Sequence, residues 1–345
     1  MLYVTTRTPN DTFTAAHTLD EFRPKDGGFF APMRLPVFSA EEIAGLKARS
    51  FSQNTAEIVN LLFGSRLDGW SVEFAIGRYP VKYANVGNRT LVAELWHNPA
   101  WRFERLARGI EKAIRQSDQI QSVPSDWLLT GARIAVLFGV FGDLLRSGGI
   151  AADAPIDVVV PSGDFSAPMA CLYAREMGLP IHNVLCSSNE NSACWNLIHK
   201  GELRTENTVT PTDTPLCDYA VPFGLERLIF HALGAAEARS FAEHCEEGKT
   251  YYLEPHQLQA LRQGLYAAVV SRRQMEAAVT SLYGSYGYLA DPYTALCVGG
   301  IGSYRSKTGE SRTALILSEE CPVHHLNVLA RCLGTDAATL KKAID

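Results

Sequence analysis

Two polar turns in the middle of the chain each follow an apolar stretch. Ser162-Gly163-Asp164-Phe165 comes soon after the apolar run 156–160, and Ser188-Asn189-Glu190 follows the run 181–186. With a helical pattern at 169–177 between them, the two runs predict a β-α-β unit of a sheet covered on both faces. Its turns leave the carboxyl ends of the strands, where open α/β sheets bind their ligands. We expect a small-molecule site here.

Other groups of reactive residues do not fit the spacing of a known site. Gly299-Gly300-Ile301-Gly302 precedes Ser306-Lys307-Thr308, but a phosphate loop needs a glycine directly before the lysine, so we expect only a glycine-bearing loop. His97, His324 and His325 lie in different predicted elements, and the 8 cysteines form no C-x-x-C pair. We therefore predict neither a zinc site nor a disulfide framework.

The composition excludes several classes of protein. Of 345 residues, 46% are hydrophobic and 20% are charged, with a net charge of -5, as in ordinary globular proteins. Basic residues do not cluster with aromatic ones, so no nucleic acid partner is expected. The most apolar run, 132–140, is shorter than the ~20 residues of a membrane span and predicts a buried helix. No secretory signal is recognisable, and we expect a cytoplasmic protein without a membrane partner.

The apolar periodicity places these segments on alternating helices and strands. Phe103, Leu106, Ile110 and Ile114 recur at helical spacing, and Ser39 has the type and position of an N-cap. The alternation predicts an α/β fold with a parallel sheet. The expected helices are a short one after Ser39, then 54–63, 69–74, 101–115, 131–145, 169–177, 225–233, 255–283, one running toward Gly299, 326–333 and 337–344; the expected strands are 90–95, 156–160, 181–186 and 312–317.

Segments along nearly the whole chain resemble threonine synthase. The resemblance implies the α/β, fold-type II pyridoxal-phosphate (PLP) architecture, with an N-terminal domain at 1–90, a core at 91–345 and a second, small lobe reduced in the region 105–127. The matching segments are Tyr3-Val4-Thr5-Thr6-Arg7, Asp26-Gly27-Gly28-Phe29-Phe30-Ala31-Pro32 with Phe38-Ser39, Glu94-Leu95-Trp96-His97, Val160-Pro161-Ser162-Gly163-Asp164-Phe165, Met177-Gly178-Leu179-Pro180-Ile181, Ser188-Asn189-Glu190-Asn191, Val221-Pro222 with Glu226-Arg227-Leu228, and Asp291-Pro292-Tyr293-Thr294-Ala295.

The chain departs from the family at the lysine that forms the Schiff base with PLP. The family signature resembles Glu-Leu-Phe-His-Gly-Pro-Thr-x-Ala-Phe-Lys-Asp, and here Glu94-Leu95-Trp96-His97 is followed by Asn98-Pro99-Ala100-Trp101-Arg102-Phe103-Glu104-Arg105. Glu104 therefore takes the position of the lysine. Because a carboxylate cannot form an imine with an aldehyde, the resemblance implies that PLP-dependent catalysis is lost, and we expect that no cofactor is bound.

Further departures from the family pattern place carboxylates at positions that face the cofactor in the family. The family's phosphate cradle resembles Ser/Thr-Gly-Asn-Phe-Gly, whereas this chain has Ser162-Gly163-Asp164-Phe165-Ser166. The segment near the cofactor ring, Ser-Thr-Ala-His-Pro in the family, corresponds to Ser318-Glu319-Glu320-Cys321-Pro322. A negative charge beside a phosphate dianion opposes its binding. Between Arg105 and Trp127 there is no room for the lobe that holds the substrate carboxylate in the family.

These substitutions lead to a hypothesis of a remodelled acidic pocket. It would bind a small amino-acid-like substrate, hold a metal ion or an amine, or perform acid–base chemistry through Glu104, His97 and Asp164. The residues expected to bind the substrate are Ser162, Gly163, Phe165, Ser188, Asn189, Glu190, Ser318 and Glu319.

Two alternatives stay open beside this hypothesis. One is a non-catalytic binding or scaffold protein, and the other is residual PLP-dependent threonine synthase or lyase activity. We predict that O-phosphohomoserine, the substrate that the resemblance implies, is not converted to threonine. Because loss of the small lobe would expose surface, a homodimer is a further expectation.

Overall fold

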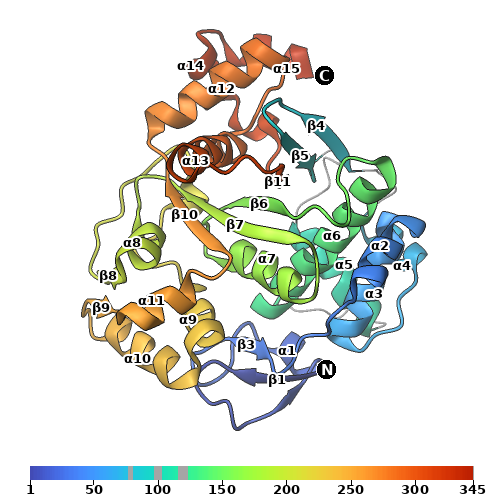
Figure 1. Ribbon diagram of the computed structural model, residues 1–345, viewed down its shortest axis with the longest axis vertical. Coiled ribbons are helices and arrows are strands. Elements are labelled where there is room, and N and C mark those ends of the chain that lie inside the picture. The colour runs from blue at the N-terminus through green and yellow to red at the C-terminus, as the bar shows by residue number, and fades with distance from the viewer. Residues whose placement is uncertain (77–80, 97–102, 116–122, 345) are drawn as a thin grey trace.

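The computed structural model describes residues 1–76, 81–96, 103–115 and 123–344, and the backbone alone at 75–76, 103–106 and 343–344. A six-stranded sheet runs through its middle, in the order β10-β7-β6-β11-β5-β4 (Figure 1). All neighbouring strands are parallel except β4, which is antiparallel to β5 at one edge. The α/β class predicted from the sequence is confirmed. The strands are β4 (Lys82–Asn85), β5 (Thr90–Glu94), β6 (Ile156–Pro161), β7 (Ile181–Ser188), β10 (Leu265–Val269) and β11 (Ala314–Ser318).

Helices cover both faces of this sheet, which explains why β6 is apolar at most of its positions, and its one buried carboxylate, Asp157, pairs with His182. Val158 and Val160 pack into the core formed with α6 (Asp126–Ser147) and α7 (Ser166–Glu176). Val159, between them, points to the opposite face and packs with α12 (Arg272–Tyr286) and α13 (Pro292–Thr308). Successive side chains of a strand alternate between faces, so a strand buried on both sides is apolar at nearly every position.

Helix α6 packs beside α7 in the core on one face of the sheet (Figure 1). Among the described helices it is long and apolar enough to cross a membrane, but 78% of its most apolar window is buried inside the protein. Ser125 caps its first turn by accepting a hydrogen bond from the Leu128 N–H. The predicted buried helix is therefore confirmed, and its apolar character is that of a core element.

Smaller elements surround the central sheet. One sheet joins β2, β1 and β3, and another joins β8 and β9. These strands are β1 (Leu2–Thr5), β2 (Phe13–Thr14), β3 (Phe30–Pro32), β8 (Glu202–Leu203) and β9 (Tyr251–Tyr252). The remaining helices are α1 (His17–Asp20), α2 (Ala40–Gly45), α3 (Phe51–Phe63), α4 (Gly69–Ile76), α5 (Phe103–Arg115), α8 (Ala193–Lys200), α9 (Leu225–Leu233), α10 (Ala235–Glu246), α11 (Pro255–Leu261), α14 (Leu326–Leu333) and α15 (Ala337–Ile344), with 3-10 turns at Leu46–Ala48, Pro215–Cys217 and Pro322–His325.

Two predictions about secondary structure are wrong. The expected helix at 255–283 is divided into α11, β10 and α12, because Gly264 adopts a positive φ and the alanine-containing segment Leu265–Val269 pairs with β7. Pairing with a neighbouring strand outweighs local helix propensity here. The glycines at 299–302 lie inside α13 and not in a loop. Gly299 and Gly300 let this helix approach Val270 and Ser187 closely.

Candidate functional site

The turn after β6 is built on two residues with positive φ. Gly163 has φ 46° and Phe165 has φ 76°, a conformation that favours glycine at the first and is rare for a phenylalanine. The Phe165 ring is fully buried in the core, which holds the backbone in this form. The Ser162 N–H also donates to the Ser187 carbonyl on β7, at 2.8 Å. The turn is thus fixed at the carboxyl edge of the sheet.

Asp164 uses its carboxylate to cap the first residue of α7. One carboxylate oxygen accepts the Ser166 N–H at 2.8 Å and the Ser166 hydroxyl at 2.5 Å. Pro168, in the same first turn, has no N–H to offer. Backbone N–H groups at a helix N-terminus are the usual donors to a bound phosphate. Here an internal carboxylate has taken one of those positions.

Arg133 of α6 brings a positive charge into this site. Its Nε and one terminal nitrogen donate to the two carboxylate oxygens of Glu319, each at 3.2 Å, and its other terminal nitrogen donates to the Ser166 hydroxyl at 3.4 Å. Burial lowers the pKa of Arg133, but the charges of Glu319 and Asp164 outweigh burial and raise the pKa overall. The arginine is therefore charged.

Arg133 interrupts the apolar run 132–140 from which the buried helix was predicted. An arginine within a helix that is otherwise buried needs an anionic partner, because an unpaired buried charge is costly. That signal was present in the sequence, but it could not say which carboxylates would meet the arginine. Two of the carboxylates in the hypothesis, Asp164 and Glu319, lie around Arg133. Their negative charge is thus balanced in part by a residue that the hypothesis did not include.

Ser318, the last residue of β11, lies in a different hydrogen-bond network from its neighbour Glu319. Its hydroxyl accepts from the indole N–H of Trp96 at 3.0 Å and interacts with Thr294 at 2.8 Å and Asp291 at 3.1 Å. Burial raises the pKa of Asp291, although hydrogen bonds from Thr294 oppose this. Ser318 and Glu319 therefore point toward different elements, as neighbouring residues on a strand do.

The expected substrate-binding residues after β7 hold the surrounding backbone in place. The Ser188 hydroxyl donates to the Ala268 carbonyl at 3.1 Å. The Asn189 amide nitrogen lies 2.8 Å from the Thr212 hydroxyl and 2.7 Å from an Asp218 carboxylate oxygen, and a Glu190 carboxylate oxygen accepts the Arg272 N–H. These contacts join the end of β7 to β10, α12 and the segment 210–218.

The segment 210–218 in turn contacts the turn after β6 through Cys217. Burial raises the pKa of the Cys217 thiol to about 11, against hydrogen bonds from the Gly163 backbone and the Ser162 hydroxyl. The contacts of Asn189 and Cys217 therefore connect the two polar turns that the sequence singled out. Both turns do lie at the carboxyl edge of neighbouring parallel strands, as predicted.

Two of the expected catalytic groups are not visible in the site. His97 lies outside the described residues. Glu104 is in the first turn of α5, but its side chain is outside the described part of the chain. Among the side chains that the structure describes, no group of three His, Cys, Asp or Glu residues is placed to hold a metal ion. The described part of the candidate site consists of Asp164, Ser166, Arg133 and Glu319.

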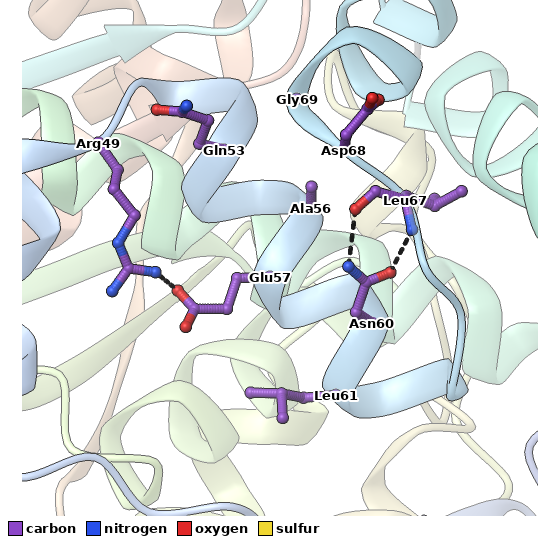
Figure 2. Close-up of a pocket in the computed structure, with 9 residues that line it drawn as sticks. All are labelled: Arg49, Gln53, Ala56, Glu57, Asn60, Leu61, Leu67, Asp68 and Gly69. Carbon is purple, nitrogen blue, oxygen red and sulfur yellow. Dashed lines mark hydrogen bonds and ion pairs between the residues drawn. The ribbon is translucent and has the colours of Figure 1, made fainter.

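A hollow of about 530 Å³ lies elsewhere, between α3 and α4 (Figure 2). Arg49 and Glu57 form an ion pair in it, and Asn60 exchanges two hydrogen bonds with the Leu67 backbone, at 2.8 and 2.7 Å. Arg49 is thus paired with Glu57, and Asn60 with Leu67. Its described lining includes none of the residues predicted for the site.

Comparisons with known proteins point to one group of enzymes. No family model matches the chain. It is 31% identical over 159 residues to "Threonine synthase-like 1" of Homo sapiens, covering 45% of this chain and 21% of that protein. It is 27% identical over 157 residues to the threonine synthase of Eremothecium gossypii, covering 41% of this chain and 30% of that enzyme. The matched part thus spans a fifth to a third of these relatives' length.

A solved structure matches over almost the whole chain. PLP-bound threonine synthase from Brucella melitensis superposes with a TM-score of 0.84 at 18% identity, covering 97% of this chain and 92% of that one. This likeness establishes the fold. It also corrects the expectation that no cofactor is bound, which the comparisons contradict: the relatives include a threonine synthase, the structural neighbour carries PLP, and the likeness points to PLP.

The turn after β6 does not fit the phosphate of PLP in the arrangement seen. The Asp164 carboxylate accepts the Ser166 N–H and hydroxyl that would face such a group, and its charge would repel a dianion. A phosphate would have to displace this side chain.

Proposed function

We propose that this chain, a homologue of the threonine synthases with their fold, has lost the lysine-dependent reaction of that family. We propose further that it serves as a binding protein for a small amino-acid-like ligand. Glu104 at the position of the lysine supports the first part. The Arg133–Glu319 pair, with Asp164 and Ser166 beside it, carries the second part.

The residues around Arg133 offer charges of both signs within one small region. The guanidinium can hold a carboxylate or phosphate group, which it recognises through two parallel N–H donors. The Asp164 carboxylate can accept hydrogen bonds from an ammonium group. An amino acid carries both of these groups, so this arrangement favours a zwitterion over a purely acidic or purely basic ligand.

The described carboxylates are better suited to binding than to proton transfer. Asp164 is engaged with Ser166, and Glu319 is paired with Arg133. Both carboxylates are thus engaged by groups within the chain, and a general acid or base must be free to reach the substrate. This arrangement favours the binding role over the acid–base enzyme.

The first experiment tests the loss of the family reaction. The purified protein is incubated with O-phosphohomoserine, with and without added PLP, and free threonine and phosphate are measured. We expect neither product above a protein-free blank. Threonine formation by the unmodified protein would refute the proposal. Glu104→Lys, assayed in parallel by the visible absorbance of lysine-bound PLP, tests whether that position alone prevents the bond.

The second experiment tests the binding role by calorimetry with O-phosphohomoserine as the probe. Arg133→Met is expected to weaken binding at least tenfold, because a charge-assisted bidentate contact contributes roughly 1.5–3 kcal/mol. Arg146→Met is the matched control, since Arg146 lies on the same helix but is exposed and paired with Asp143. Equal effects of the two substitutions, or binding by neither variant nor the unmodified protein, would contradict the binding role.

A further inference from the structure

Glu319 lies on the Arg133 guanidinium as an external carboxylate would. Both of its oxygens face the guanidinium, in the two-point arrangement that arginine also makes with bound oxyanions. The contacts are long at 3.2 Å, because charge-assisted N–H···O bonds usually measure about 2.7–2.9 Å. Arg133 and Glu319 therefore form an ion pair with longer N···O distances than a tight pair has.

The two partners differ in how freely they can move. Arg133 is anchored in the long buried helix α6, and its side chain is 18% exposed. Glu319 follows the last residue of β11, and its side chain is 26% exposed. A rotation of Glu319 can therefore carry its carboxylate toward water at modest cost in solvation, whereas Arg133 must stay in place.

We propose that Glu319 is an internal competitor that occupies the anion-binding face of Arg133 and is displaced when a small oxyanion-bearing ligand binds. This inference rests on the proposed binding function and adds to it how the site is controlled. The displaced state keeps Asp164 near the arginine, so a ligand that also carries an ammonium group replaces the lost charge balance. The favoured ligand is therefore an amino acid with a terminal carboxylate or phosphate.

The competition has a direct consequence for affinity. A ligand that binds only the open form has its apparent affinity reduced by the fraction of molecules that are open. Removing the negative charge of Glu319 should raise the fraction of molecules in the open form. It should also leave more of the positive charge of Arg133 unbalanced. Affinity for an oxyanion should therefore rise, which is the opposite of what loss of an ordinary binding residue would cause.

The test compares inorganic phosphate binding in Glu319→Gln and in the unmodified protein by calorimetry. We expect about tenfold tighter binding in E319Q, equivalent to a change of about 1.4 kcal/mol. Glu320→Gln is the matched control, because Glu320 is the next residue but pairs with His325. E320Q should bind phosphate within about twofold of the unmodified protein. If E319Q is not folded by circular dichroism, Glu319→Asp replaces it, and its shorter side chain should give a smaller rise in the same direction.

The outcomes separate this inference from the function on which it rests. If the unmodified protein, E319Q and E319D all fail to bind phosphate, Arg133 is not an anion site and the proposed function fails as well. If phosphate binds but the substitution of Glu319 leaves the affinity unchanged or weaker, the binding role stands and the internal competitor is refuted. An equal rise in E320Q would show a general charge effect and would also refute it.

Discussion

Gly300 of α13 lies against Ser187 of β7 so closely that a Cβ atom on the glycine would stand 2.1 Å from the serine hydroxyl oxygen. The contact lets the helix rest directly on the sheet behind the turn at Ser188. The same helix carries Gly302, around which a Cβ would meet nothing within 4 Å. Two glycines in one helix thus have different reasons to be glycine.

This difference predicts opposite effects of alanine at the two positions. Gly300→Ala should lower the free energy of unfolding by about 1–3 kcal/mol, because the added carbon forces the helix and strand apart. Gly302→Ala should raise it by about 0.5–1 kcal/mol, because alanine loses less backbone entropy in a helix. Urea unfolding measures both. Similar changes in the free energy of unfolding for the two variants would show that the close contact between Gly300 and Ser187 does not limit stability.

The amide of Asn189 fastens the segment 210–218 beside the site. Asn189→Ala removes its contacts with Thr212, Thr214 and Asp218, and we expect the free energy of unfolding to fall by roughly 1–3 kcal/mol because the hydrogen bonds of a buried amide are lost. Limited proteolysis should then cut within 210–218 faster than in the unmodified protein. Asn207→Ala, at an exposed contact with Arg204, is the control and should cost less than about 0.5 kcal/mol. Unchanged cleavage in N189A would contradict this role.

The buried carboxyl of Asp291 predicts a dependence of stability on pH. Because burial raises the pKa of Asp291 above that of the unfolded chain, the folded protein binds the proton more tightly. The contribution of Asp291 to stability is therefore present at low pH and is lost as pH rises from about 4 through its raised pKa. Asp291→Asn cannot ionise but can still cap α13, so its unfolding free energy should fall less steeply with pH.

The control for this measurement has the opposite sign. Hydrogen bonds from Thr339 lower the pKa of Asp336, an exposed carboxylate at the start of α15. Its contribution is present at neutral pH and is lost on acidification. Asp336→Asn should therefore reduce the loss of stability on acidification. Urea unfolding at several pH values distinguishes the two, and a D291N curve parallel to that of the unmodified protein would exclude the effect of Asp291.

The ion pair between Arg227 and Asp126 is a buried contact of the N-terminal half with α9. Arg227 also donates to the Phe30 carbonyl at 3.2 Å and is fully buried. Arg227→Met should cost about 3–5 kcal/mol, because it leaves a buried carboxylate without its partner. Arg204→Met, at an exposed pair with Glu202, should cost at most about 1 kcal/mol. Thermal unfolding compares the two, and equal losses would argue against this assignment.

Most of the local elements, and the departures from the threonine synthase pattern, are evident from the sequence alone. The apolar runs before Ser162 and Ser188 specify two buried parallel strands, and their polar turns lie where such strands end. The replacement of the expected lysine by Glu104 is also evident from the sequence alone. These inferences succeed because strand periodicity and motif spacing involve residues close together in the chain.

Which charges meet depends on contacts between distant parts of the chain. Arg133 and Glu319 are 186 residues apart, and no local pattern relates them. The same applies to the segment Leu265–Val269, whose local composition favours a helix but whose pairing with β7 makes it a strand. Long-range contacts set the energy of a buried charge and of a strand edge. The sequence therefore pointed to the carboxylates of Asp164 and Glu319 but not to Arg133, which lies between them in charge balance.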